Sequence, residues 1–167
     1  MGKPTSPGSG LTLARLRRPD ESLLKTLADY DREAFGSAGL RVYDLAVTAE
    51  AGAVFTAEIE KELVGSSQLL RVLDEPGFFY VVGFYIRPQW QGRGLGRALL
   101  MAVAGEARQM GACGLVLTVS PHNLRALNLY RSAGFVDEAF ISRFYGEGKD
   151  RHLLRWRFPE GDLCGGV

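Results

Sequence analysis

The most informative part of this chain is the stretch Phe84-Tyr85-Ile86-Arg87-Pro88-Gln89-Trp90-Gln91-Gly92-Arg93-Gly94-Leu95-Gly96-Arg97. It closes an apolar run that begins at Phe78, and its glycine-rich turn leads directly into a helical pattern. Glycines let the backbone approach a ligand closely, and the first turn of a helix presents N–H groups without intrahelical partners. These groups and the positive end of the helix dipole favour a phosphate or pyrophosphate. The stretch therefore predicts a phosphorylated cofactor.

The bulk composition is that of an ordinary globular domain. The 167 residues suffice for one domain with a sizeable core, and 46% apolar with 23% charged residues is a usual balance. Lys and Arg number 20 against 19 Asp and Glu, so the net charge is +1. Such a small charge creates no electrostatic field that would attract nucleic acid or an anionic membrane. No apolar run approaches the ~20 residues that span a bilayer. We therefore expect neither nucleic acid nor a membrane as a partner.

The cysteines and histidines predict neither a disulfide framework nor a metal site. Cys113 and Cys164 are only two, and their surroundings predict one buried thiol and one that faces solvent. Together with His122 and His152 they show no metal-ligand spacing, so we assign no metal. Residues 1–10 lack the charged-then-apolar order of a signal peptide. We expect a cytoplasmic, reduced protein.

Periodicity divides the chain into alternating strands and helices. Strands are predicted at Leu11–Arg17, Ala53–Glu60, Leu63–Leu73, Phe78–Ile86, Leu115–Val119, Val136–Tyr145 and His152–Phe158. Helices are predicted after Asp20 on the stripe Leu23, Leu24, Leu27 and Ala28, at Leu40–Ala49, from Gly94 to Met110, and at Leu124–Ala133.

The resulting order is β-α-α-β-β-β-α-β-α-β-β, which predicts the α/β (α+β) class. We expect a single domain over residues 11–158, between a flexible leader (1–10) and a loose tail (159–167). Antiparallel hairpins in the first half and a crossover at the glycine turn predict a mixed, mostly antiparallel sheet with helices on both faces.

Two familiar phosphate-binding patterns fail. A nucleotide P-loop requires Gly-x-x-x-x-Gly-Lys-Ser/Thr, which does not occur in this sequence. A dinucleotide fold requires Gly-x-Gly-x-x-Gly and an acid about 20 residues further on. Here the third glycine comes one residue early, and the next strand ends in Thr118-Val119-Ser120 without an acid.

A third pattern fits. Gln91-Gly92-Arg93-Gly94-Leu95-Gly96 resembles the Gln/Arg-x-x-Gly-x-Gly/Ala signature of the GNAT superfamily, the acetyl-CoA-dependent N-acetyltransferases. A second segment resembles the family pattern Asn-x-x-Ala-x-x-Leu-Tyr-x-x-x-Gly-Phe: Asn123-Leu124-Arg125-Ala126-Leu127-Asn128-Leu129-Tyr130-Arg131-Ser132-Ala133-Gly134-Phe135. The element order is also the family's, so the resemblance covers roughly Leu11 to Phe158.

The resemblance implies roles for named residues. The backbone amides of Gln91, Gly92, Arg93, Gly94, Leu95 and Gly96 would bind the pyrophosphate of acetyl-CoA, the cosubstrate. Main-chain groups of Phe84, Tyr85 and Ile86 would pair with the pantetheine amides, as a strand added to a sheet edge does. Arg93 and Arg97 would flank the phosphates, although a solvated helix face is an equal interpretation of Arg97.

Two further roles lie in the second motif. Asn123 would cap its helix and contact the cofactor. Tyr130 matches the family tyrosine that protonates, or hydrogen-bonds to, the leaving thiolate. A phenol with a pKa of ~10 stays protonated at pH 7 and can donate to a thiolate whose conjugate acid has a pKa near 8.5.

The sequence departs from the family pattern at the residue that would act as general base toward the amine. The branch that acetylates the N-terminal alanine of ribosomal proteins often has a glutamate on the fifth strand, and Thr118 stands at that position. The segment Arg143-Phe144-Tyr145-Gly146-Glu147-Gly148 is similar to that branch's paired aromatics, so the likeness is partial. Deprotonation through water by Glu33, Asp44, Glu58 or Glu60 stays open.

The pKa of the amine therefore affects which substrate can react without a close base. An α-amino group with a pKa of ~8 is about one tenth neutral at pH 7, whereas a lysine with a pKa of ~10.4 is almost wholly charged. Without a close carboxylate, a low-pKa amine is the easier substrate.

Our principal hypothesis is acetyl transfer from acetyl-CoA to a primary amine, either a peptide N-terminus or a small molecule. The alternative is a catalytically weak acyl-CoA-binding regulatory module, which Thr118 motivates, and a dinucleotide oxidoreductase ranks third. Exposed strands near the C-terminus are compatible with a homodimer. We expect the first two helices and the last hairpin to select the amine.

Overall fold

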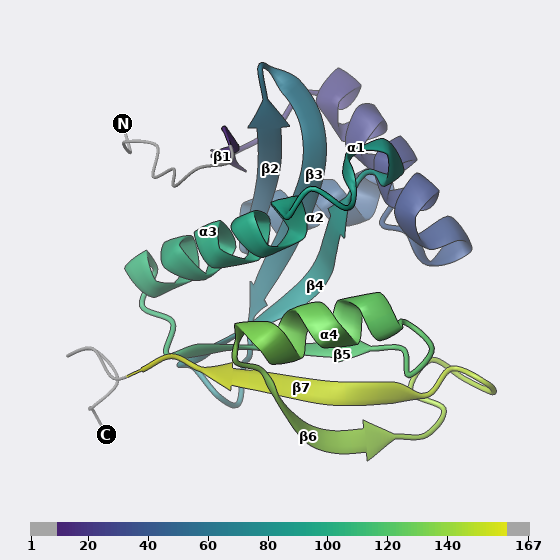
Figure 1. Cartoon of the computed structure of the whole chain (residues 1–167). Coiled ribbons are helices and arrows are strands. Elements are labelled where there is room, and N and C mark those ends of the chain that lie inside the picture. The colour runs from purple at the N-terminus through teal and green to yellow at the C-terminus, as the bar shows by residue number, and fades with distance from the viewer. Residues whose placement is uncertain (1–9, 160–167) are drawn as a thin grey trace. The chain divides into compact units, whose positions relative to one another are not determined.

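The computed structural model describes residues 10–159, and its elements follow the predicted order (Figure 1). The strands are β1 (Thr12–Leu16), β2 (Ala53–Ile59), β3 (Glu62–Arg71), β4 (Phe78–Ile86), β5 (Gly114–Val119), β6 (Val136–Ile141) and β7 (Arg151–Arg157). The helices are α1 (Glu21–Phe35), α2 (Val42–Ala51), α3 (Leu95–Gln109) and α4 (Leu124–Ala133), with 3-10 turns η1 (Gly36–Ala38) and η2 (Pro88–Trp90). Apart from Gly10 and Pro159, the expected leader and tail lie outside the described residues.

The strands form one sheet in the order β1-β2-β3-β4-β5-β7-β6. The pairs β1–β2, β2–β3, β5–β7 and β6–β7 are antiparallel, and β4–β5 is parallel. The parallel ladder joins Phe78–Tyr80 to Gly114–Val116. It is parallel because α3 carries the chain from the end of β4 back to the start of β5. The prediction of a mixed, mostly antiparallel sheet is confirmed.

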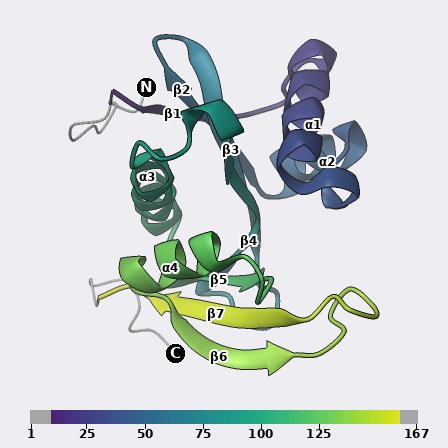
Figure 2. The same ribbon diagram turned by 45° about the vertical axis from the view of Figure 1, so that its right-hand side comes forward.

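The chain divides into two compact units, and the first comprises the residues up to Leu70 together with Val81–Val103. Within it, α1 and α2 lie on one face of β2, β3 and the end of β4, and the first part of α3 lies on the other face (Figure 2). Helix α1 begins where the Asp20 carboxylate accepts a hydrogen bond from the backbone N–H of Leu23 (2.8 Å). Its apolar stripe and α2 pack together around Leu24, Leu27, Leu45, Ala49 and Val54.

The second unit comprises Arg71–Tyr80 and the residues from Ala104 onward. Both views place α4 alongside β5 and β7 (Figures 1 and 2). Successive aromatic contacts fill its interior, from Tyr130 through Phe135 and Trp156 to Phe158, with ring centroids 5.0 to 5.5 Å apart. These contacts join α4 to β7, so they fix the position of the second motif on the sheet.

Two sequence expectations need correction. The predicted strand Val136–Tyr145 ends at Ile141, because Arg143 adopts a positive φ (+55°) and its backbone N–H donates to the Asp150 carboxylate (2.8 Å) instead of to a strand. The expectation of a free buried thiol at Cys113 is also wrong, because this residue is disulfide-bonded. Within residues 10–159, every helix is too short or too polar to cross a membrane.

Candidate active site

The glycine-rich turn lies in the first unit, between η2 and α3. Gly92 and Gly94 have φ angles of +78° and +76°, and a Cβ at either position would meet no atom within 4 Å. Backbone conformation, and not crowding, therefore requires glycine at both positions. Both glycines are exposed, whereas Leu95 at the first position of α3 is buried. The turn thus anchors the helix and leaves the backbone before it accessible.

The polar side chains of the turn differ in their contacts. The side-chain amide of Gln91 donates to the backbone carbonyl of Ile86 (2.8 Å), and its backbone N–H is bonded within η2. The guanidinium of Arg93 lies over the ring of Trp90, 4.7 Å from its centroid. Arg97 is exposed one helical turn further along. Gln91 therefore ties the turn to the end of β4, while the two arginines place positive charge beside the helix N-terminus.

The end of β4 is held closely by β3. Tyr85 and Ile86 are buried, and the preceding residue, Phe84, is half-buried. A Cβ at Gly65 on β3 would lie 2.5 Å from the Tyr85 carbonyl oxygen and 2.8 Å from Ile86 Cδ1. Glycine at position 65 thus allows the two backbones to meet. The segment predicted to pair with pantetheine is consequently well fixed.

Helix α4, in the second unit, is capped at both ends. The side chain of Asn123 accepts a hydrogen bond from the backbone N–H of Ala126 (3.1 Å). Gly134 adopts the left-handed conformation (φ +118°), and a Cβ there would lie 2.8 Å from Nε1 of Trp156. The structure thus explains why asparagine stands at position 123 and glycine at position 134.

Tyr130 is buried on α4, with 7% of its surface exposed. Its ring centroid lies 5.4 Å from that of Phe135. Burial raises the pKa of the Tyr130 phenol well above its ordinary value. The phenol is therefore a hydrogen-bond donor at any physiological pH.

The model of the acetyltransferase (GNAT) family matches residues 16–135. The chain belongs to this family. It is an acetyl-CoA-dependent N-acetyltransferase. Both motifs, from Gln91 to Gly96 and from Asn123 to Phe135, fall within the matched region.

Curated relatives of this acetyltransferase act on different amines. An aminoglycoside N(6')-acetyltransferase type 1 of Stenotrophomonas maltophilia is 33% identical over 128 residues, covering 75% of this chain and 74% of the relative. The [ribosomal protein bS18]-alanine N-acetyltransferase of Escherichia coli K12 is 42% identical over 74 residues, covering 44% of this chain and 47% of the relative. The match therefore spans less than half of the second relative.

Solved structures share the fold. The crystal structure of the Escherichia coli ribosomal-protein-S18-alanine N-acetyltransferase has a TM-score of 0.76 and 20% identity, and covers 94% of this chain and 99% of that chain. A Salmonella typhimurium acetyltransferase with its cofactor acetyl-CoA has a TM-score of 0.73 and 19% identity, and covers 95% of this chain and 100% of that chain. The GNAT fold predicted from the two motifs is thus confirmed.

Thr118 of this acetyltransferase has a hydroxyl partner that the sequence did not reveal. The Tyr80 hydroxyl lies 2.9 Å from Thr118 Oγ1, at the last paired residue of β4 with β5. Burial raises the pKa of the Tyr80 phenol, while its hydrogen bond to Thr118 acts in the opposite direction, and the nearby Tyr145 phenol raises the pKa as well. The Tyr80 phenol is therefore neutral near pH 7. The pair of hydroxyl groups can bind an amine or a water molecule, but it cannot remove a proton as a carboxylate would.

Two of the carboxylates considered as relayed bases are committed to other contacts. Glu33 pairs with Arg87 (3.2 Å), and Asp44 pairs with Arg41 (3.1 Å), to whose backbone N–H it also bonds. Glu60 lies in the turn between β2 and β3, with a φ of +50°. Within residues 10–159, no group of three or more His, Cys, Asp and Glu side chains could hold a metal ion.

Sequence reasoning missed one carboxylate, Asp31, which is 1% exposed. Its Oδ1 accepts a hydrogen bond from the backbone N–H of Leu40 (2.8 Å). Burial raises the pKa of Asp31 to about 6, and the hydrogen bond from Leu40 only partly offsets this. A signal was available, because Asp31 continues the stripe of Leu24, Leu27 and Ala28 at helical spacing.

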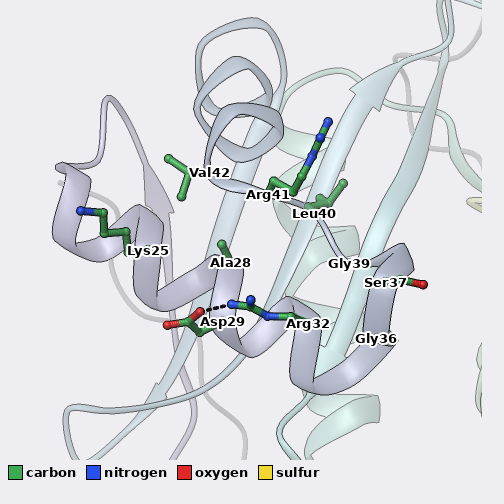
Figure 3. Close-up of a pocket in the computed structure, with 10 residues that line it drawn as sticks. All are labelled: Lys25, Ala28, Asp29, Arg32, Gly36, Ser37, Gly39, Leu40, Arg41 and Val42. Atoms are coloured by element: carbon green, nitrogen blue, oxygen red, sulfur yellow. Dashed lines mark hydrogen bonds and ion pairs between the residues drawn. The ribbon is translucent and has the colours of Figure 1, made fainter.

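An open pocket of about 550 Å³ lies between α1 and the start of α2 (Figure 3). It is lined by Lys25, Ala28, Asp29, Arg32, Gly36, Ser37, Gly39, Leu40, Arg41 and Val42. A Cβ at Gly39 would lie 2.8 Å from the Asp31 carbonyl and from the Arg32 nitrogen, so this wall packs directly on α1. Leu40 lines the pocket while its N–H binds Asp31. The pocket lies in the first two helices and the link between them, where the sequence predicted selection of the amine.

Proposed function

We propose that the protein transfers the acetyl group of acetyl-CoA to a primary amine, either a peptide N-terminus or an amine of a small molecule. The observation that carries the proposal is the turn before α3, where Gly92 and Gly94 are exposed in left-handed conformations. Such a turn lets main-chain donors approach a pyrophosphate. The two acceptor classes are those of the relatives, an aminoglycoside for one and a ribosomal-protein alanine for another.

In this proposal the cofactor contacts come from three segments. The backbone of residues 91–96 binds the pyrophosphate, with Arg93 and Arg97 beside it, and the backbone of Phe84, Tyr85 and Ile86 pairs with pantetheine. Asn123 adds a contact at the start of α4. The exposure of Arg93 and Arg97 and the firm support of β4 by Gly65 favour these assignments.

Chemistry in this proposal is direct attack in a ternary complex. The amine nitrogen bonds to the thioester carbon, the carbon–sulfur bond breaks, and coenzyme A leaves as a thiolate. Tyr130 donates a hydrogen bond to that sulfur. Because burial holds the pKa of the phenol above that of a thiol, Tyr130 stabilises the thiolate chiefly as a donor. The amine nitrogen supplies the proton that coenzyme A finally retains.

A panel of amines tests the proposal. Purified protein is mixed with acetyl-CoA and with alanine-initiated peptides, polyamines, amino acids or aminoglycosides, and release of the thiol is followed. We expect release with at least one class. Calorimetry with CoA is the companion measurement, and a protein that registers no heat with CoA or acetyl-CoA contradicts the proposed cofactor site.

One observation favours a second candidate, a catalytically weak acyl-CoA-binding module. The Thr118 hydroxyl, hydrogen-bonded to Tyr80, stands at the position where an acid is often found. Binding of acetyl-CoA without turnover of any amine in the panel would support this candidate over the enzyme.

Location and assembly belong to the same proposal. A cytoplasmic location fits an enzyme that meets acetyl-CoA and a ribosomal or small-molecule amine. A homodimer would form through β6, which ends the strand order and exposes Val136 and Phe140. Light scattering of the purified chain distinguishes monomer from dimer, and Phe140→Asp is expected to shift a dimer toward monomer.

A further inference from the structure

Three buried polar atoms in the first unit lack hydrogen-bond partners among the described residues. They are Asp31 Oδ2, Gln68 Oε1 and the Tyr85 hydroxyl oxygen. Their residues are 1%, 0% and 5% exposed. Each unsatisfied buried polar atom costs roughly 1–3 kcal/mol, and native proteins have few of them. Three in one region therefore require an explanation.

These residues, here called the Asp31 cluster, meet on the α1 side of β3 and β4. Gln68 and Ser66 are linked on β3, where Gln68 Nε2 donates to Ser66 Oγ (2.8 Å). Burial raises the pKa of the Tyr85 phenol on β4, the Asp31 carboxylate raises it further, and Ser66 acts in the opposite direction. Leu40 links Asp31 to this part of the sheet, since its N–H binds Asp31 Oδ1 and its Cδ1 lies 3.8 Å from the Cβ position of Gly83. A Cβ at Gly83 would overlap Gln68 Oε1, so the glycine makes room for that amide.

Most donors inside the Asp31 cluster are already used. Leu40 N–H binds Asp31 Oδ1, and Gln68 donates to Ser66, whose own hydroxyl donates to the Phe55 carbonyl (2.8 Å). The remaining carboxylate and amide oxygens, Asp31 Oδ2 and Gln68 Oε1, can only accept, whereas the Tyr85 hydroxyl can also donate one hydrogen bond. That single O–H cannot satisfy both oxygens, so the cluster is short of donors.

The cluster also lacks a positive charge. The cation that acts on Tyr85 is Arg87, and its guanidinium is already engaged with Tyr30 and Glu33. No ion pair of Asp31 occurs among residues 10–159. A buried carboxylate without a countercharge is costly unless a cation arrives or a proton is taken up.

An ammonium group satisfies both needs, because it carries three N–H donors and one positive charge. Amines reach an acetyltransferase mostly in this charged form. We propose that the Asp31 cluster receives the ammonium group of the amine substrate and that Asp31 is the base that removes its proton. This inference rests on the proposed function and names the base for it.

The route to the cluster follows from Leu40. Its side chain lines the open pocket, its N–H binds Asp31, and its Cδ1 lies 3.8 Å from the Cβ position of Gly83. Displacement of the Leu40 side chain opens the cluster to a substrate in the pocket. Tyr85 belongs to the segment proposed to pair with pantetheine, so the deprotonated amine is released beside the cofactor strand.

The proton balance is simple. One N–H bond of the ammonium breaks, its electron pair stays on nitrogen, and the proton bonds to Asp31 Oδ2. The neutral amine then attacks the thioester, and Asp31 returns its proton to solvent after the products leave. A carboxyl with a pKa of about 6 suits this exchange better than an exposed aspartate, because its proton affinity is closer to that of an amine.

The test measures kcat/KM against pH from 6 to 9.5 with an alanine-initiated peptide and with kanamycin. The variants are Asp31→Asn and, as a matched control, Asp74→Asn in the exposed turn after β3. We expect Asp31→Asn to lower kcat/KM for the peptide at pH 7 by roughly tenfold, because only about one tenth of an α-amino group with a pKa of ~8 is neutral at that pH. The deficit should shrink as the pH approaches the pKa of the amine, because a neutral amine needs no base. Asp74→Asn should follow the wild type.

A merely structural role of Asp31 predicts a different pattern, an equal loss at every pH and a changed dissociation constant for acetyl-CoA. Either this pattern or a wild-type rate in Asp31→Asn overturns the inference while the proposed function stands. A wild-type protein that acetylates none of the amines contradicts the proposed function itself. If Asp31→Asn does not fold, Gln68→Leu takes its place, with a several-fold rise in KM for the peptide expected and an unchanged KM counting against the cluster.

Discussion

The guanidinium of Arg87 lies over the ring of Tyr30, 3.7 Å from its centroid. The same guanidinium pairs with Glu33 (3.2 Å), and its side chain is only 15% exposed. Arg87 directly follows β4, and both partners belong to α1. The helix that lines the pocket of Figure 3 thus contacts the residue that follows the strand proposed to hold pantetheine.

Replacing Arg87 is expected to loosen this contact. Arg87→Ala removes the stacking and leaves Glu33 without its partner, so we expect the free energy of unfolding to fall by about 1–3 kcal/mol. Arg87→Lys should be more stable than Arg87→Ala but less stable than the wild type, because an ammonium cannot stack as a planar guanidinium does. Urea unfolding of the three proteins measures the series. Equal stability of the lysine variant and the wild type would argue against stacking.

Tyr130→Phe tests the donor to the thiolate. We expect kcat to fall by about 10²–10⁴-fold, because the departing sulfur loses its hydrogen bond. The dissociation constant of acetyl-CoA should change little, since the ring and its contact with Phe135 are kept. Stopped-flow thiol release and calorimetry measure the two quantities. An unchanged kcat would remove Tyr130 from the reaction.

Gly94→Ala tests the turn. The substitution places a Cβ at a φ of +76°, a conformation that costs alanine roughly 1–2 kcal/mol. We expect weaker binding of acetyl-CoA by calorimetry, because the turn shifts away from the shape that suits a pyrophosphate. The matched control is Gly105→Ala within α3, where a Cβ meets nothing within 4 Å. That variant should bind normally and gain about 0.5–1 kcal/mol of stability. If both variants bind alike, the turn is not the cofactor site.

Asp31 makes stability depend on pH in a defined direction. Its pKa is raised in the folded protein to about 6, so folding favours the protonated form. Its contribution is fully present below the unfolded pKa of about 4 and is lost as pH rises through 6. The gap in unfolding free energy between Asp31→Asn and the wild type should therefore grow by up to about 3 kcal/mol between pH 4 and pH 7. Urea titrations at both pH values measure the gap, and a constant gap would show that Asp31 titrates normally.

Local signals explain why much of the fold was predictable. Helix α4 runs from Leu124 to Ala133 as predicted, because Asn123 caps one end and Gly134 the other. Strand β4 also has its predicted bounds, since it is apolar throughout and ends before Pro88. These residues act through their own backbone, so their effect can be read from neighbours in the sequence.

The parts that escaped prediction depend on distant partners. The charge of Asp31 acts on the Tyr85 phenol, although the two residues lie 54 positions apart in the sequence. Likewise the hydroxyl pair of Tyr80 and Thr118 joins residues 38 positions apart. Periodicity can place Asp31 on the apolar stripe of α1, but it cannot name the distant partner in such a pair, because each member alone looks like an ordinary strand or helix residue.

The close packing of Gly39 on the α1 backbone limits how this enzyme can acquire new substrates. Any larger residue there would pry the link between the two helices away from Asp31. If the pocket receives the amine as proposed, mutant libraries aimed at other amines should therefore keep position 39 fixed and randomise Ser37, Leu40 and Val42, which line the same pocket.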